Sequence, residues 1–305
     1  MQTLKSILVA VDFSTGSRAA LDQASRIARL QDARLQVLHV VDSSAVAAMA
    51  ASRESSYESQ ARTATLGAQS ALQAWLAFSE VPANAELTIS VGTPLHEILE
   101  HVRSTQADLL VAGITGSGEA TAGAGSVSSK LARKSPSRVL LVRSHHRHAF
   151  QKIIACIDFS ETAREVVASA RRIALKDSAT VDFLHVWREP WIVTPHQSEV
   201  VESTYPTLVF TSAERQAYLE NLRRELHDFI GTAAQGITST ETLHESMNHA
   251  NGIVAQAQER AADLIIVGSK GRTNLRYVLM GSTAERLLTR LPCSLLVVRP
   301  SPENP

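Results

Sequence analysis

The sequence has only two cysteines, no excess of charge of either sign and no long apolar run. Cys156 and Cys293 form no C-x-x-C pair, which argues against a disulfide framework or a zinc knuckle and fits a reducing cytoplasm. Thirty basic residues balance thirty acidic ones, so net charge does not favour nucleic acid or an anionic membrane as a partner. The N-terminal run ILVAV is short and is followed by Asp12, so we expect neither a signal peptide nor a membrane span.

What the sequence does contain is an internal repeat, because several segments of the first half return in the second. The matching pairs are ILVAVDFS and IIACIDFS, LHV and LHV, ADLLVAG and ADLIIVG, and GSVSSKLARKSPSRVLLVR and GSTAERLLTRLPCSLLVVR. A repeat of this length predicts two domains, residues 1–144 and 150–300, each close to the usual domain size.

Within each copy, short apolar runs alternate with longer segments of helical period. This β-α-β-α order predicts an α/β fold, in which an open parallel sheet carries helices on both faces. Ligands of such sheets bind beyond the carboxyl ends of the strands. The residues at those ends are Asp12, Val40 and Gly113 in the first copy and Asp158, Val186 and Gly268 in the second.

The last strand expected in each copy is a short apolar run, Val139 to Val142 or Leu295 to Val298. An unpaired apolar edge strand is prone to association, and pairing removes that edge. We therefore expect the two domains to pack as an internal pseudo-dimer through these strands. Further association of two chains into a homodimer is a weaker expectation.

Two other segments are notable. The join between the copies holds His145, His146 and His148, which suggest a metal site, although histidines on a polar linker are more often only solvated and no carboxylate or thiolate lies nearby. The second copy also has an insertion at residues 187–210, rich in Pro, Trp and Tyr. We expect this insertion to be an irregular loop or lid.

The stretch GSKGRTNLRYVLMGST at residues 268–283 has unusual glycine spacing. Gly268 ends an apolar strand, where a side chain would block close approach of a ligand, and Gly271 lets the loop turn. After nine further residues comes Gly281, where Ser282 and Glu285 have the spacing of a capping box that opens a helix over residues 283–289.

A helix N-terminus reached by a glycine turn can bind phosphate, and three cations flank this one, namely Lys270, Arg272 and Arg276. Each glycine alone could be a simple turn residue, but the set favours a phosphate site. The stretch is neither a Walker P-loop, because G-x-x-x-x-G-K-[ST] does not occur, nor a Rossmann fingerprint, because the glycines follow a late strand.

The combination of I-D-F-S after the first strand, L-H-V in the second, A-D-L-I-I-V-G and G-x2-G-x9-G-[ST] resembles the universal stress protein family, of the tandem type with two domains in one chain. The resemblance implies a Rossmann-like sheet of five strands per domain, similar to adenine-nucleotide α-hydrolases, that binds ATP. An accompanying divalent cation such as Mg²⁺ would come with the triphosphate. The implied nucleotide-binding residues are Cys156, Val186, Asp158, Gly268, Gly271, Arg272, Gly281, Ser282 and Thr283.

By the same resemblance, Cys156 and Val186 would contact adenine and Asp158 the ribose, while Gly281 to Thr283 would contact the phosphates. Some of these residues have plainer explanations. Asp158 could instead cap the helix that begins near Ser160, and Cys156 is expected in the core. His185 and its counterpart in the first copy, His39, lie in apolar strands and are expected to be core histidines.

The first copy departs from the glycine pattern. Its loop has eight residues between Gly116 and Gly125, where the second copy has nine between Gly271 and Gly281. It also carries Glu119 and lacks the cations. We therefore expect ATP to bind only the second copy.

Three functions remain open at this point. The first is a cytoplasmic ATP-binding stress or signalling protein that is at most a slow ATPase, because no general base, nucleophile triad or metal cluster can be assigned. The second is an adenine-nucleotide hydrolase, which would need an S-G-G-x-D-S loop that DFSTGS and DFSETA do not supply. The third is a scaffold for a partner protein that binds no nucleotide.

Overall fold

The computed structural model describes residues 4–77, 79–116, 123–188, 211–271 and 280–300. The strands in these ranges are β1 (Ser6–Val11), β2 (Arg34–Asp42), β3 (Glu86–Gly92), β4 (Leu109–Gly113), β5 (Arg138–Val142), β6 (Lys152–Cys156), β7 (Thr180–Trp187), β8 (Thr238–Glu245), β9 (Leu264–Gly268) and β10 (Ser294–Val298). The helices are α1 (Thr15–Gln31), α2 (Ser43–Ser52), α3 (Tyr57–Leu76), α4 (Pro94–Ser104), α5 (Ser126–Lys134), α6 (Glu161–Asp177), α7 (Ser212–Ile230), the 3₁₀ turn η1 (Gly231–Ala234), α8 (His249–Glu259) and α9 (Ser282–Leu288).

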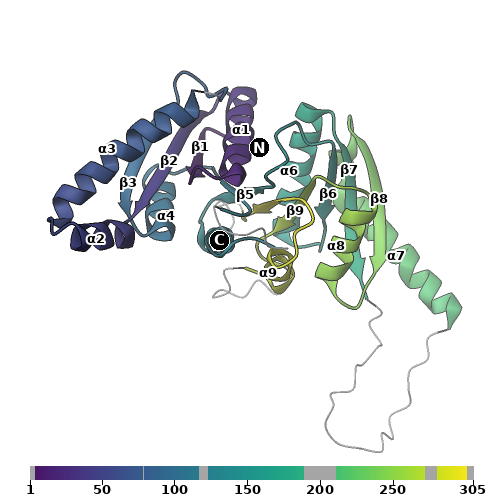
Figure 1. The fold of residues 1–305 in the computed structure, drawn as a ribbon. Coiled ribbons are helices and arrows are strands. Elements are labelled where there is room, and N and C mark those ends of the chain that lie inside the picture. The colour runs from purple at the N-terminus through teal and green to yellow at the C-terminus, as the bar shows by residue number, and fades with distance from the viewer. Residues whose placement is uncertain (1–3, 78, 117–122, 189–210, 272–279, 301–305) are drawn as a thin grey trace, which may run out of the picture.

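The ten strands form one sheet in the order β3-β2-β1-β4-β5-β10-β9-β6-β7-β8 (Figure 1). All neighbours within each set of five strands are parallel, as the alternation of strands and helices predicts. The exception is the central pair, since β5 and β10 run antiparallel with Leu140 opposite Leu296. The two five-stranded sheets that the family resemblance implies are thus continuous with each other.

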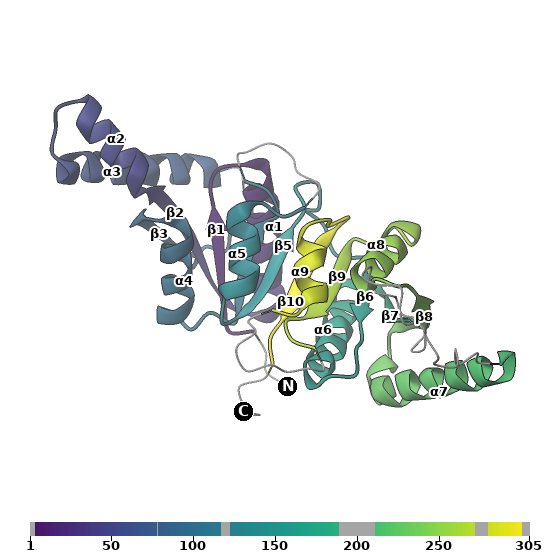
Figure 2. The same cartoon turned by 90° about the horizontal axis from the view of Figure 1, so that it is seen from below.

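Helices cover both faces of this sheet, which confirms the predicted fold class. The side chains of one core cluster come from the strands and from α1, α3, α6 and α7. Those of the other core cluster come from the opposite strand faces and from α4, α5, α8 and α9. In Figure 2 the last four helices form a row across the sheet in the order α4, α5, α9, α8. Strands buried on both faces explain why the sequence shows continuous apolar runs.

The repeat is reproduced at the level of single residues. Ser14 caps α1 by accepting a hydrogen bond from the backbone N–H of Ser17, and Ser160 caps α6 in the same way. Before each cap the backbone takes a left-handed conformation, with φ 63° at Phe13 and 62° at Phe159. The segments that match in sequence therefore form the same strand, turn and helix start in both halves.

No helix in the described ranges combines the length and the apolar character that crossing a bilayer requires. The insertion expected as a loop or lid lies, from residue 189 to 210, outside the described residues.

Candidate functional site

The carboxyl ends of β6, β7 and β9, together with the first residues of α8 and α9, enclose a cavity of about 570 Å³. This is the edge at which parallel α/β sheets bind ligands. The predicted site residues that line it are Cys156, Asp158, Val186, Gly268, Gly271, Gly281, Ser282 and Thr283. The remaining one, Arg272, lies outside the described residues, as does Arg276. Residues far apart in the sequence are thus brought to one place.

Asp158 lies between the start of α6 and the glycine loop. Its Oδ1 accepts hydrogen bonds from the backbone N (3.1 Å) and the Oγ (2.6 Å) of Ser160. Ser160, and not Asp158, is the N-cap of α6. On the other side, a Cβ atom added to Gly271 would come within 2.9 Å of Asp158 Oδ2. Glycine at this position therefore allows the loop to approach the carboxylate.

Packing within the protein also favours glycine at position 268. A Cβ atom there would lie 2.9 Å from Thr162 Cγ2 and 3.2 Å from the carbonyl oxygen of Lys270. The space that a side chain would take is thus occupied by the protein itself. The glycine allows α6 to pack against the end of β9, and it lines the cavity as a consequence of that packing.

The predicted capping box at the start of α9 is wrong by one residue. Gly281 is the N-cap, with φ −69° and ψ 151°, and α9 begins at Ser282 without a side-chain cap. Because the cap is Gly281, Glu285 lies one residue beyond the capping-box position, and its carboxylate forms an ion pair of 3.4 Å with Arg133 in the first half. The two ends of the loop still meet, since the backbone N of Gly281 donates to Ser269 O at 2.7 Å.

Cys156 and His185 are placed by the strands that carry them. Cys156 is the last residue of β6, and its partly buried side chain packs against a core cluster, as expected of a core cysteine. Burial and the nearby Asp158 raise the pKa of its thiol, which disfavours the reactive thiolate. The partly buried ring of His185 bonds through Nδ1 to Ile157 O at 2.8 Å, as expected for a structural histidine.

Two cavity residues, Arg188 and His249, were not identified from the sequence. Arg188 follows the last residue of β7, and His249 is the first residue of α8, next to its N-cap Asn248. Together with Lys270, they give the cavity three groups that can carry positive charge. Partial burial and the charges of Arg188 and Arg286 lower the pKa of His249.

The first half has an equivalent cavity of about 400 Å³. Its geometry is similar, since a Cβ atom on Gly116 would come within 2.5 Å of Asp12 Oδ2, as one on Gly271 would approach Asp158. Its charge is different, because none of its described lining residues is Lys, Arg or His, and α4 begins with Pro94 where α8 begins with His249. Glu119 lies outside the described residues.

The linker histidines do not gather as ligands. Within the described ranges, no three His, Cys, Asp or Glu side chains are grouped closely enough to hold a metal ion. The ring of His146 instead stacks on Phe150 with the centroids 4.6 Å apart.

Comparison with known proteins gives consistent matches in both halves. The model of the "Universal stress protein family" matches residues 3–143 and again residues 149–299. The chain is similar to universal stress protein YxiE of Bacillus subtilis, with 27% identity over 150 residues that cover 49% of this chain and 99% of that protein. It is also similar to universal stress protein MJ0577 of Methanocaldococcus jannaschii, with 29% identity over 161 residues, or 49% of this chain and 95% of that protein.

The fold as a whole matches a solved two-half structure. A universal stress protein from Archaeoglobus fulgidus superposes with a TM-score of 0.63 and 18% sequence identity, covering 98% of this chain and 99% of the other. At that identity the likeness concerns the fold alone.

Proposed function

The chain belongs to the universal stress protein family, and we propose that it is an ATP-binding tandem member in which residues 150–300 hold the nucleotide. The observation that carries this proposal is the single cavity of about 570 Å³ lined by every described residue of the predicted site. Its volume lies in the range of roughly 300–1,000 Å³ that is usual for small-molecule sites. Residues 1–144 form the partner domain and bind no ATP.

Charge, rather than volume, separates the two cavities. A triphosphate carries several negative charges, and each cation within about 4 Å contributes on the order of 4 kcal/mol at an effective dielectric near 20, before desolvation is subtracted. Lys270 and Arg188 supply such charges in the second half, and His249 can supply a third. The first cavity has no described counterpart to any of these groups.

The roles of the lining residues follow the family resemblance. Asp158, whose Oδ2 faces the glycine loop, would accept a hydrogen bond from the ribose. Cys156 and Val186, at the ends of β6 and β7, form the adenine side. The backbone of residues 281–283 serves the phosphates, and Arg272 is proposed as a phosphate contact from the sequence alone.

The lining residues favour binding over turnover. Asp158 is the single carboxylate among the described lining residues, and it is engaged by Ser160. A divalent cation such as Mg²⁺ would be held mainly by the triphosphate itself, with at most Asp158 from the chain. We therefore place this protein among stress or signalling proteins that sense nucleotide, with at most slow hydrolysis.

The assembly that accompanies this function is an internal pseudo-dimer. The antiparallel pairing of β5 and β10 supports it, because this pairing closes an apolar edge in each half. The partly buried Cys156 and buried Cys293, both free thiols, fit a reducing cytoplasm. Small-angle scattering of the chain should give one compact particle; two separately tumbling lobes would contradict the pseudo-dimer.

A matched pair of glycine variants tests the nucleotide proposal. A Cβ atom on Gly281 would be 3.7 Å from Gly271 N, and one on Gly125 would be 3.5 Å from Ile114 O, so both positions leave ordinary contact distance in the protein. Gly281→Val places methyl groups between the two ends of the loop, where the phosphates would pass. Gly125→Val makes the equivalent change in the first half.

Calorimetric titration with ATP should give one site per chain. Gly281→Val should abolish most of the binding, whereas Gly125→Val should leave both affinity and stoichiometry unchanged. Two sites per chain, or loss of binding in Gly125→Val alone, would show that the halves are assigned the wrong way round. Unchanged affinity in both variants would place the nucleotide elsewhere.

A further inference from the structure

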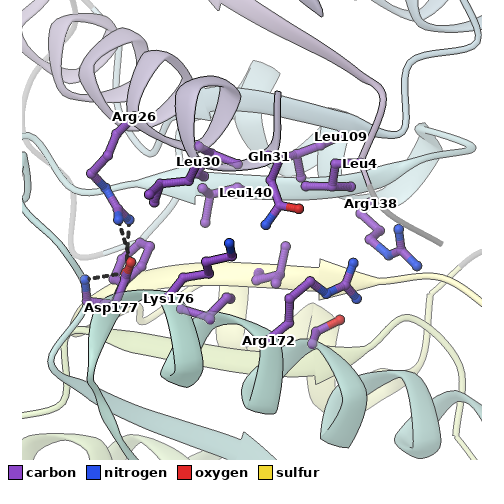
Figure 3. Close-up of a pocket in the computed structure, with 15 residues that line it drawn as sticks. Leu4, Arg26, Leu30, Gln31, Leu109, Arg138, Leu140, Arg172, Lys176 and Asp177 are labelled. Atoms are coloured by element: carbon purple, nitrogen blue, oxygen red, sulfur yellow. Dashed lines mark hydrogen bonds and ion pairs between the residues drawn. The ribbon is translucent and has the colours of Figure 1, made fainter. Parts of the chain in front are cut away.

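A second kind of cavity lies between α1 and α6, over the seam where β5 meets β10 (Figure 3). It has a volume of about 70 Å³ and shares no lining residue with either of the cavities at the carboxyl edge of the sheet. The buried side chains of Leu109, Leu140 and Leu296 form its floor. The nucleotide proposal therefore leaves this cavity without a role.

The repeat explains why the cavity has two unlike walls. When the two helices of seventeen residues are aligned end to end, Ile27 of α1 corresponds to Ile173 of α6, and both line the cavity. One turn further on, however, Leu30 on α1 corresponds to Lys176 on α6. The α1 wall is thus apolar at a position where the α6 wall carries an ammonium group.

The polar groups of the α6 wall lie on one side of that helix. Ser169, Arg172 and Lys176 follow one another at intervals of three and four residues, which places them on a common face. All three line the cavity. Figure 3 shows Arg172 and Lys176 reaching from α6 into the space below α1.

The lining of this cavity contains more cationic than anionic side chains. Four cationic side chains line it against one carboxylate, Asp177, which is paired with Arg26 at 2.5 Å. Arg138 pairs at 3.2 Å with Glu165, which lies outside the lining. Lys176 has no ion pair with any residue in the described ranges. Burial and, to a lesser extent, the like charge of Arg138 lower the pKa of Arg172, while Glu165 opposes the shift.

A buried hydroxyl in the lining is available to bond a ligand. Ser169 is only 4% exposed, and its Oγ has no hydrogen-bond partner among the described residues. A buried polar atom without a partner costs about 1–3 kcal/mol, and native structures seldom retain one without a reason. An anion placed beside Arg172 would accept the hydrogen bond that Ser169 can donate.

We propose that this cavity binds a short straight-chain carboxylate, its chain lying on the leucine floor and against Leu30 and its head group held by Ser169, Arg172 and Lys176. The apolar floor and wall exclude a fully hydrated anion such as inorganic phosphate as the preferred ligand, because its polar oxygens would be desolvated there. The enclosed volume accepts on the order of five groups of the size of a water molecule. It therefore suits a chain of about that many carbons.

Titration of the full chain with straight-chain carboxylates from acetate to decanoate tests the proposal. Affinity should rise roughly fourfold for each of the first methylenes and then level off once the enclosed part is full. The alcohol of the same length as hexanoate should bind more weakly by about tenfold or more, because it lacks the charge that Arg172 and Lys176 would contact. Affinity that does not depend on chain length, or that is equal for hexanol and hexanoate, would overturn the proposal.

Neighbouring arginines on α6 provide a matched control. Arg172→Gln should weaken hexanoate binding by about tenfold or more, whereas Arg171→Gln, which lies outside the cavity lining, should not change it. Ile173→Phe should shorten the chain length at which affinity levels off, because the larger ring fills part of the cavity. Equal affinity in Arg172→Gln and Arg171→Gln would refute the assignment. ATP titration of Arg172→Gln should be normal, which separates failure of this proposal from failure of the nucleotide proposal.

Discussion

Removal of the Asp177 carboxylate should destabilise the chain far more than removal of an ordinary surface charge. Asp177 is the last residue of α6, and its side chain is 3% exposed. Its Oδ1 accepts from Arg26 Nη1 at 2.5 Å, and its Oδ2 accepts from Arg26 Nη2 at 3.0 Å and from the backbone N of Phe150 at 2.9 Å. One carboxylate thus joins α1 of the first half, the linker and α6 of the second half.

The expected loss of stability follows from the groups that the substitution leaves without a partner. Asp177→Ala would leave the Arg26 guanidinium, in a side chain that is 19% exposed, without its carboxylate. It would also leave the N–H of the buried Phe150 unpaired. Breaking a buried ion pair from one side costs about 3–5 kcal/mol, a large part of a typical total stability of about 5–15 kcal/mol.

Glu86→Ala is the control, because the side chains of the ion pair that Glu86 forms with Arg34 are 49% and 52% exposed, and exposed pairs contribute little to stability. Urea unfolding followed by circular dichroism measures both variants against the unchanged chain. The double substitution of Asp177→Leu with Arg26→Leu should recover part of the loss, since no unpaired charge then remains buried. If Asp177→Ala costs no more than Glu86→Ala, the claim that this carboxylate holds the three segments together is wrong.

Two further predictions concern titratable groups. Partial burial and the charges of Arg188 and Arg286 lower the pKa of His249 in the free protein, and a bound triphosphate should raise it. ATP affinity should therefore rise as the pH falls from about 8 to about 6. ATP itself titrates in this range, so calorimetry on His249→Gln measures the pH dependence of affinity without the histidine. An equally steep pH dependence in that variant would exclude His249 as its cause. Burial raises the pKa of Cys293 to about 12 and also raises that of Cys156. Neither thiol should therefore react with iodoacetamide at neutral pH until urea is added, which mass spectrometry can check. Rapid labelling of the native chain would contradict this prediction.

The central strands of each half could be predicted from the sequence because of where they lie. Strands β1, β4, β6 and β9 are covered on both faces, and apart from Ser6 and Lys152 at two of their starts their residues are apolar. Strand β8 is at the edge of the sheet and is mostly exposed or partly exposed, with the sequence TSTETLHE. No apolar run marks it, so the helix after it could not be placed, and His249 at the start of that helix was missed.

The position of the N-cap explains the error at α9. The sequence SerThrAlaGlu at residues 282–285 has the spacing of a capping box only if Ser282 is the cap. In the folded chain, Gly281 N bonds to Ser269 O, Gly281 is the N-cap and Ser282 is already helical, so Glu285 lies one residue too far along the helix. Its carboxylate pairs instead with Arg133 of the first half at 3.4 Å.

The cavity between α1 and α6 could not be predicted from the sequence, although most of its lining belongs to the repeat. A duplicated domain that pairs edge to edge places equivalent side chains opposite each other, so Ile27 and Ile173 alone would give a symmetric apolar gap. The difference between Leu30 and Lys176 places an apolar side chain on α1 opposite a cationic one on α6, and it matters only because the two positions line one cavity. At the carboxyl edge, by contrast, each half keeps its own cavity, and the change from Pro94 to His249 gives one copy a charge that the other lacks. Duplication therefore supplies two sites that can diverge independently and one, at the seam, that exists only when both halves are joined.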